Sequence, residues 1–335
     1  MTDAAIESNG HLASIQDALR EDIRAVLEGR RRVALANFPD ITNVGDSAIW
    51  LGTIAILTSL DVEVCWQGAA SDVDVRSILE TEPEAILLNG GGNFGDLWRG
   101  QQQARELILA SRPATKVIQL PQSAFFRHGA NALRNAELWA RIQHGTILWR
   151  EERSLGWAMR SLPGVDHRLS HDMAFGLSGL DRTRRHRFDA VWIMRTDQES
   201  LGRQLPDLPS SMEVTDWAAS DGDTPALSAL RADAAHEHAD RDTDYRRLGG
   251  IYREMAEIRL ARGIGLLSLA EAVVTDRLHA HLLATLLGQP QVLLDNSYGK
   301  VFSVHRHSIG SDPHIRLAAD PNEALDVLKH DLLRA

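Results

Sequence analysis

Ala272-Val273-Val274-Thr275-Asp276-Arg277-Leu278-His279 is the stretch that decides the fold. Its apolar and β-branched beginning predicts a short buried strand over Ala272–Thr275, and the spacing that follows predicts a helix over Arg277–Leu287. A second apolar run, Gln291–Leu294, predicts another strand. Strand, helix and strand in this order form a unit that places the two strands parallel to each other.

The same alternation is predicted along the rest of the chain. The predicted strands are Arg32–Asn37, Val62–Trp66, Ala85–Asn89, Lys116–Leu120, Thr146–Trp149 and Ala190–Met194. The predicted helices are Ile15–Leu27, Asp46–Leu60, Val73–Leu79, Gln102–Leu109, Ala132–Ile142, Glu152–Ser161, Tyr245–Arg262 and Glu323–Leu333. The acidic stretch 220–244 is predicted only as a polar segment. Such alternation is typical of parallel sheets with helices on both faces.

The length of the chain and one break in its pattern predict two domains. The chain has 335 residues, and a basic run over 181–187 reads as a solvated linker. We therefore predict an α/β protein of two Rossmann-like domains with parallel sheets, residues 1–180 and 181–335, with the active site in the cleft between them. Ligands of such sheets bind outside the carboxyl ends of the strands, so the loops after strands are the candidate sites.

Composition excludes several classes of protein. Hydrophobic residues make up 44% of the chain and charged residues 24%, as in ordinary globular proteins. The net charge of −10 provides no general basic field for nucleic acid. Cys65 is the single cysteine, which excludes an internal disulfide and a multi-cysteine zinc site. No signal peptide or membrane-spanning run is predicted, so we expect a cytoplasmic protein, with a position at the inner face of the membrane left open.

Polar loops follow the strands of the first domain. Asn43-Val44-Gly45-Asp46 opens a helix. Either Asp46 or Ser47 caps this helix, or Asn43 and Asp46 contact the hydroxyls of a sugar or orient the attacking group. The four glycines of Asn89-Gly90-Gly91-Gly92-Asn93-Phe94-Gly95-Asp96 predict a loop whose backbone a ligand or the other domain approaches closely. A loop over 121–123 is expected at the same edge. The residues predicted for the acceptor side of the cleft are Asn43, Gly45, Gly91, Gly92, Asn93, Asp96, Gln122 and Arg150.

The strongest candidates are Arg277 and His279. Asp276 is expected to cap their helix, which places both side chains in its first turn. A helix N-terminus attracts anions, and basic residues there destabilise an empty helix end. The pair therefore predicts a bound phosphate or carboxylate, and His279 can donate a proton near neutral pH.

Other basic residues have two interpretations each. Arg195 and Lys300 either complete the anion site or are exposed loop charges, and His281 is expected to be structural. His167 and His171 flank Asp172, but no third ligand stands out, so no metal site is predicted.

Taken in order, these segments resemble the polysaccharide pyruvyl transferase family. The resemblance rests on Asn43–Asp46, Gly90–Asp96, Leu120–Ser123, Arg150–Ser154 and Thr275–His279. The segment Asp295–Lys300 is similar to the exopolysaccharide branch of that family. The likeness runs from about residue 31 to residue 310.

The resemblance implies a fold like that of GT-B glycosyltransferases and a reaction with phosphoenolpyruvate as donor substrate. The product would be a pyruvate ketal on two hydroxyls of one sugar, in a glycan or lipid-linked acceptor. Arg277 and His279 match the Arg-Leu-His site expected to hold phosphoenolpyruvate, and Arg195 or Lys300 would help with the departing phosphate. His279 is the implied proton donor and Asp46 the implied acceptor, with neither cofactor nor metal.

Two other classes stay open. A nucleotide-sugar glycosyltransferase could use the same architecture and bind a diphosphate at Arg277 and His279. A glycan-binding relative without activity is the second alternative, although a degenerate copy could easily have lost both residues.

Overall fold

The computed structural model describes residues 3–182, 186–217, 224–239 and 243–333, which form two parallel sheets. The first sheet has the order β2-β1-β3-β5-β6-β7, and β4 also pairs with β5. The second sheet has the order β12-β11-β10-β8-β9, and the strand pairings of the described residues are parallel in both sheets. The predicted α/β class with two Rossmann-like sheets is confirmed, whereas the GT-B likeness and the division at residue 180 stay predictions.

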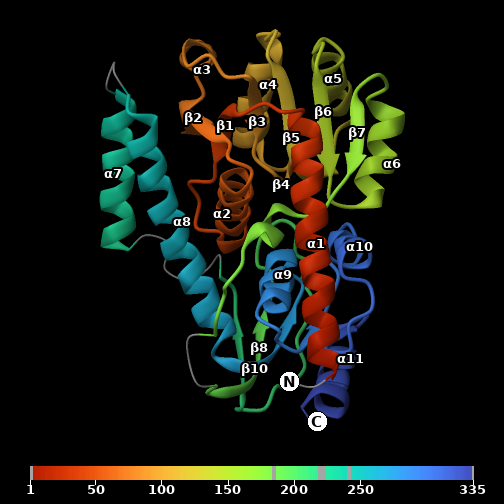
Figure 1. Cartoon of the computed structure of the whole chain (residues 1–335). Coiled ribbons are helices and arrows are strands. Elements are labelled where there is room, and N and C mark those ends of the chain that lie inside the picture. The colour runs from red at the N-terminus through yellow and green to blue at the C-terminus, as the bar shows by residue number, and fades with distance from the viewer. Residues whose placement is uncertain (1–2, 183–185, 218–223, 240–242, 334–335) are drawn as a thin grey trace.

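The first sheet is built between residues 32 and 169. Its strands are β1 (Arg32–Phe38), β2 (Glu63–Ala69), β3 (Ala85–Leu88), β4 (Gly91–Gly95), β5 (Lys116–Phe125), β6 (Gly145–Trp149) and β7 (Asp166–Leu169). The helices between them are α2 (Val44–Ser59), α3 (Val75–Glu80), α4 (Arg99–Ala110), α5 (Gly129–Trp139) and α6 (Glu152–Ser161). A 25-residue helix, α1 (Asp3–Leu27), precedes them and runs along both halves of the molecule (Figure 1).

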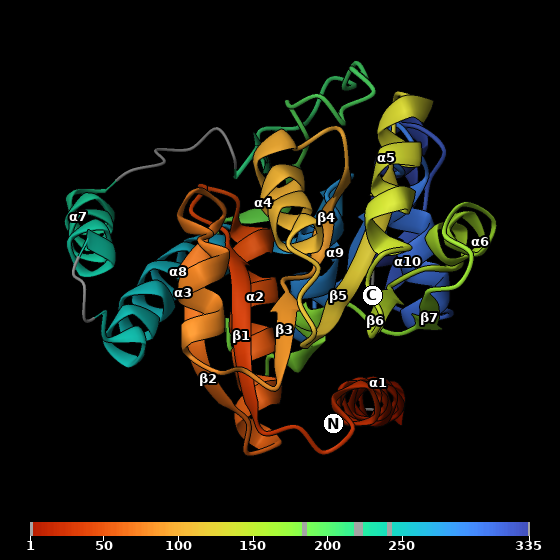
Figure 2. The ribbon, with the colours of Figure 1, turned by 90° about the horizontal axis from the view of Figure 1, so that it is seen from above.

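The second sheet is built between residues 188 and 317. Its strands are β8 (Phe188–Ile193), β9 (Met212–Thr215), β10 (Ala270–Thr275), β11 (Gln291–Leu293) and β12 (Ile315–Leu317). Its helices are α7 (Pro225–Ala239), α8 (Tyr245–Leu267), α9 (Leu278–Leu286), α10 (Lys300–Ser308) and α11 (Pro321–Val327), the last continued by a π-helical turn over Leu328–Leu332. Figure 2 shows α7 at the margin of the molecule, beside α8.

Alternate residues of β1 point to different cores. Ala34 and Ala36 pack with α3, α4, α5 and α6 on one face of the first sheet. Val33 and Leu35 belong to the opposite core, which also contains buried residues of α1, α2, α8 and α9. That second core continues to Val273 and Leu293 of the other sheet, so one body of apolar side chains joins the two halves.

Several predicted boundaries were wrong. The glycine-rich segment and the segment 121–123 are not loops, because Gly91–Gly95 is strand β4 and pairs with β5, which continues to Phe125. Helix α9 begins at Leu278 with Arg277, not Asp276, at its N-cap. Helix α2 is capped by Asn43 rather than by Asp46 or Ser47. The polar segment 220–244 contains α7, and only its parts 224–239 and 243–244 lie within the described residues.

Candidate active site

The carboxyl ends of both sheets face one cavity of about 260 Å³. The first sheet lines it with the segments after β1, β3 and β6, and the second with those after β8, β10 and β11. Nine of the thirteen predicted site residues lie in this lining: Asn43, Asp46, Gly92, Asn93, Arg150, Arg195, Arg277, His279 and Lys300. The structure therefore brings the acceptor-side and donor-side candidates together.

The other four predicted residues lie around the cavity. Gln122 is buried behind the glycine-rich strand, where its side-chain amide donates to Asn89 O at 3.0 Å and to Asn93 Oδ1 at 2.9 Å. Gly91 has φ of +127° and packs against Ile49 of α2. Asp96 lines a neighbouring groove.

Gly45 allows the N-terminal ends of α2 and α9 to meet. A Cβ atom at this position would lie 2.2 Å from Nδ1 of His279, which no side chain could tolerate without displacing the imidazole. The preceding Asn43 accepts from Gly45 N at 3.2 Å and donates to Asp46 Oδ2 at 2.7 Å. The first turn of α2 therefore positions both His279 and the carboxyl group of Asp46.

His279 lies beside two carboxyl groups whose pKa values are shifted in opposite directions. Oδ2 of the buried Asp172 is 3.4 Å from His279 Nε2. Burial opposes ionisation of Asp172, but Arg150 and His279 outweigh it and hold the pKa of this carboxyl well below its usual range. Burial raises the pKa of Asp46, against the opposing effects of His279 and the Asn43 hydrogen bond. Asp172 is thus suited to stabilise an imidazolium, and Asp46 to exchange a proton.

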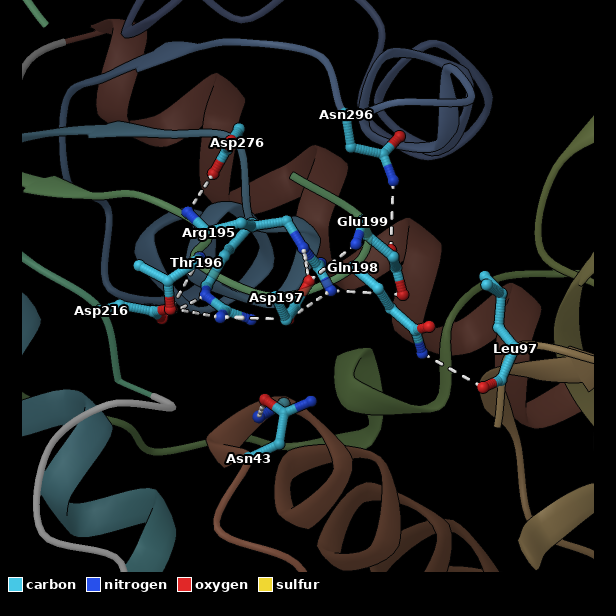
Figure 3. A network of polar contacts seen from close by, with 12 residues as sticks. Asn43, Leu97, Arg195, Thr196, Asp197, Gln198, Glu199, Asp216, Asp276 and Asn296 are labelled. Carbon is cyan, nitrogen blue, oxygen red and sulfur yellow. Dashed lines mark hydrogen bonds and ion pairs between the residues drawn. The ribbon is translucent and has the colours of Figure 1, made fainter. Parts of the chain in front are cut away.

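Carboxylates hold the cations of the second sheet in place (Figure 3). Arg195 Nη2 lies 2.9 Å from Asp197 Oδ2 and 3.2 Å from Glu199 Oε1. Arg277 donates from Nη2 to Asp216 Oδ2 at 2.6 Å and to Asp197 Oδ2 at 3.3 Å. Because each guanidinium has several donors, these pairs fix its orientation and still leave other N–H groups for a ligand.

Arg150 and Lys300 converge above Gly92. Arg150 is fully buried, donates to Asp172 and Ser123, and its Nη2 finds no hydrogen-bond partner among the described residues. A Cβ atom at Gly92 would lie 3.2 Å from this Nη2 and 3.2 Å from Lys300 Nζ. The missing side chain therefore leaves a space that two cationic nitrogens face. An anionic oxygen in this space would satisfy the unpartnered donor.

The protonation of Lys300 is sensitive to what occupies that space. Burial and the neighbouring Arg195 and Arg150 charges lower the pKa of Lys300 to about 8, against the opposing effect of Glu199. Glu199 accepts from Lys300 Nζ at 2.6 Å and from Asn296 Nδ2 at 3.1 Å. A bound anion would stabilise the charged lysine.

Apart from Asp46, the carboxylates of this site were not predicted as site residues from the sequence. Asp197 and Glu199 follow β8 directly, and their position after a strand was a usable signal. Asp172 was considered only as a metal ligand, although it pairs with Arg150. The two histidines that flank Asp172 in the sequence lie apart from the cavity. His167 contacts Trp149, and His171 stacks on His307. Within the described residues, no group of three or more His, Cys, Asp or Glu side chains is placed to hold a metal ion.

These features define an α/β protein with a cleft between two parallel sheets that is lined by arginine and lysine side chains. The chain belongs to the polysaccharide pyruvyl transferase family, whose model, described as "Polysaccharide pyruvyl transferase", matches residues 43–298. This match confirms the predicted family and the coarse activity, pyruvyl transfer.

Two curated relatives carry names of the same kind. "Pyruvyl transferase 1" of Schizosaccharomyces pombe is 29% identical over 299 residues, which cover 83% of this chain and 69% of the relative. "Putative pyruvyl transferase EpsO" of Bacillus subtilis is 30% identical over 284 residues, covering 82% and 84% respectively. Both names support membership of the family.

A solved structure supports the fold alone. An uncharacterized protein from Klebsiella pneumoniae subsp. pneumoniae is similar with a TM-score of 0.57 and 18% identity, over 95% of this chain and all of that one. Among the residues that the structure describes, no helix combines the length and apolar character needed to cross a membrane.

Proposed function

We propose that this protein transfers the pyruvyl group of phosphoenolpyruvate onto two hydroxyls of one sugar, in a bacterial exopolysaccharide or its lipid-linked precursor. The observation that supports phosphoenolpyruvate as the donor is the space above Gly92. The unpartnered Nη2 of Arg150 and Nζ of Lys300 both face this space. Phosphoenolpyruvate carries a phosphate and a carboxylate, so it needs more than one cationic contact. Arg195 and Arg277 line the same cavity and are the candidates for the second anionic group.

The proton transfers follow from the residues around His279. In the proposed reaction, His279 protonates the methylene carbon of the donor, and Asp172 stabilises the imidazolium before transfer. The first sugar hydroxyl attacks the resulting cationic carbon, and Asp46 accepts the hydroxyl proton.

The second hydroxyl then displaces the phosphate and closes the ketal. The two sugar hydroxyls release two protons. One replaces the proton that His279 adds to the methylene carbon, and the other leaves with inorganic phosphate, so the protons balance. Arg150, Arg277 and Lys300 stabilise the charge on the departing phosphate. We place the reaction in the cytoplasm, including its membrane face, where a lipid-linked acceptor would be presented.

The first test measures inorganic phosphate released from phosphoenolpyruvate by the purified protein, with and without a panel of galactosides, glucosides and mannosides. We expect release that depends on an acceptor, and a pyruvate ketal on that sugar by mass spectrometry. His279→Ala should abolish turnover and leave the protein folded, since the side chain is at the cavity surface. His144→Ala, which removes an exposed histidine, is the matched control and should keep full activity.

Absence of phosphate release, together with no thermal stabilisation by phosphoenolpyruvate, would contradict the proposal. A fully active His279→Ala variant would remove this residue from the role of proton donor. Stabilisation by a nucleotide instead would favour a nucleotide-sugar glycosyltransferase.

A further inference from the structure

A groove with a volume of about 530 Å³ lies beside the cavity. It is lined mainly by residues 96–101 at the start of α4 and by Arg127, His128 and Asn131 at the start of α5. Ile41, Trp98 and Gln101 line both the groove and the cavity. The two are therefore parts of one depression, with the half-buried Trp98 at their boundary.

The groove is positively charged although the chain as a whole carries −10. Arg99 and Arg127 are exposed, and in the described part of the chain neither guanidinium pairs with a carboxylate. The Arg127 guanidinium donates only a long hydrogen bond among the described residues, from Nη2 to Gln198 Oε1 at 3.5 Å. Guanidinium groups that line one groove without a carboxylate partner are suited to bind phosphate or carboxylate.

Asp96 is the one acidic residue in the described lining of the groove, and its carboxylate accepts hydrogen bonds from the segment 127–131. Its carboxylate accepts from Arg127 N at 2.7 Å, His128 N at 2.9 Å and Asn131 Nδ2 at 3.0 Å. Burial opposes its ionisation, but these hydrogen bonds outweigh burial and lower the pKa of Asp96. The carboxylate therefore holds the Arg127–His128 turn, and among the described residues it forms no ion pair with either guanidinium group.

One helix end reinforces this charge. Trp98, the N-cap residue of α4, makes no side-chain capping hydrogen bond, whereas the start of α5 already holds the Asp96 carboxylate, which accepts from His128 N. By contrast, Asn43 caps α2 and Glu151 caps α6. The positive end of the α4 dipole and two arginines thus line one groove, an arrangement that an anion stabilises.

We propose that this groove binds an anionic group, phosphate or carboxylate, that the acceptor carries next to the sugar receiving the pyruvyl group. Trp98 lines both the cavity and the groove, so its indole is placed to contact a sugar ring that lies between them. This proposal rests on the proposed function, and it assigns the protein to charged rather than neutral acceptors.

The test compares pairs of acceptors that share the same sugar and differ in whether the substituent next to it is charged. The phosphate pairs are galactose, glucose and mannose 1-phosphates against the methyl glycosides of the same sugars, and the carboxylate pair is lactobionate against lactitol. With the wild-type protein we expect kcat/KM to be at least tenfold higher for the charged member of one kind of pair, and the kind of pair identifies the anion. The double variant Arg99→Ala/Arg127→Ala should lower this preference at least tenfold, toward equality.

The control variant is Arg141→Ala, which removes an exposed arginine beyond the C-terminal end of α5 and should keep the full preference. Equal kcat/KM for all pairs in the wild type, or a preference that survives the double variant, would overturn the proposal.

Calorimetric binding of the same compounds without phosphoenolpyruvate separates this proposal from the proposed function. If the charged compounds bind in a way that depends on Arg99 and Arg127 but no ketal forms, the proposed reaction is contradicted and the anion-binding groove is supported. If ketals form on methyl glycosides with no preference for charge, the proposed reaction is supported and the anion-binding groove is contradicted.

Discussion

At the scale of single residues, the absence of a side chain at Gly92 is what creates room for an anion. Gly92→Ala would place a methyl group 3.2 Å from Arg150 Nη2 and 3.2 Å from Lys300 Nζ. Its φ lies outside the left-handed region, so alanine fits the backbone. We expect the variant to fold with an unchanged melting temperature and a KM for phosphoenolpyruvate raised at least tenfold, because the methyl group occupies the place of an anionic oxygen. Steady-state kinetics and thermal unfolding check both expectations.

Gly250→Ala is the matched control for this substitution. Gly250 lies on α8, and a Cβ atom there would meet no heavy atom within 4 Å. This variant should keep the wild-type KM, and its stability should stay equal or rise by less than about 1 kcal/mol. A Gly92→Ala variant with wild-type KM would show that the donor binds elsewhere in the cavity.

Residue types at strand ends were sufficient to predict the basic residues of the site but, apart from Asp46, not the acidic ones. Arg277 and His279 stand out because cations at a helix N-terminus need an anion nearby. Asp216 carries no such signal, because it follows β9, a strand of four residues with only one of them buried. Its pairing with Arg277 depends on the neighbouring positions of β8, β9 and β10 in the sheet, which local sequence does not specify.

At the scale of elements, α7 and α8 hold the segment 39–43 that lines the cavity. Asp40 accepts from Arg231 Nε at 2.7 Å and from Arg259 Nη2 at 2.8 Å, and Arg259 also donates to Pro39 O at 3.1 Å. Arg262 donates to Thr42 O at 2.6 Å. Side chains from two helices far along the chain therefore position the loop between β1 and α2.

Asp40→Asn should weaken this attachment, because the buried Arg259 loses its carboxylate partner. We expect a loss of about 2 kcal/mol in the free energy of unfolding and a higher KM for the acceptor, since Asn43 and Thr42 line the cavity. Urea denaturation and acceptor kinetics measure the two effects. Asp17→Asn is the control, because its partner Arg20 is on the exposed face of α1 and such pairs contribute less than about 1 kcal/mol. Equal losses in both variants would contradict the role of Asp40.

The elements that were predicted correctly have strong apolar patterns, and those that were missed do not. The glycine-rich strand β4 has little β-propensity and exists because β5 offers it a hydrogen-bonding edge. Helix α7 has few buried residues and packs mainly on α8. In both cases tertiary contacts, which a local pattern does not contain, decide the structure.

At the scale of the whole molecule, the continuous core makes the two halves depend on each other. Residues of both sheets belong to this core, together with α1, whose Gln16 donates to Phe175 O at 3.1 Å and to Leu177 O at 2.8 Å. The cavity between the sheets therefore lies in one packed body. This packing keeps Arg150, after β6, and Lys300, after β11, at a fixed separation.

Buried histidines in that body predict how its stability changes with pH. His281 of α9 is fully buried, 2.9 Å from Gln291 Oε1, and its Nε2 is 3.3 Å from Nδ1 of the buried His305 of α10. Burial and the neighbouring His305 lower the pKa of His281 to about 3, and burial lowers that of His305. Burial and the charges of His307 and His11 lower the pKa of His171 to about 4.

Unfolded histidines take up protons below a pH of about 6.5, while these folded ones do not. The unfolded state therefore binds more protons, and the free energy of unfolding should fall as pH decreases from about 6.5 to about 4, by up to about 1.4 kcal/mol per pH unit for each histidine. Urea denaturation at a series of pH values measures this slope. His281→Gln should lower stability at pH 8 and reduce the slope by about one proton, whereas His330→Gln, at an exposed position, should leave it unchanged. A wild-type slope in the His281→Gln variant would mean that this imidazole becomes protonated in the folded protein, which the packing of α9 against α10 and β11 opposes.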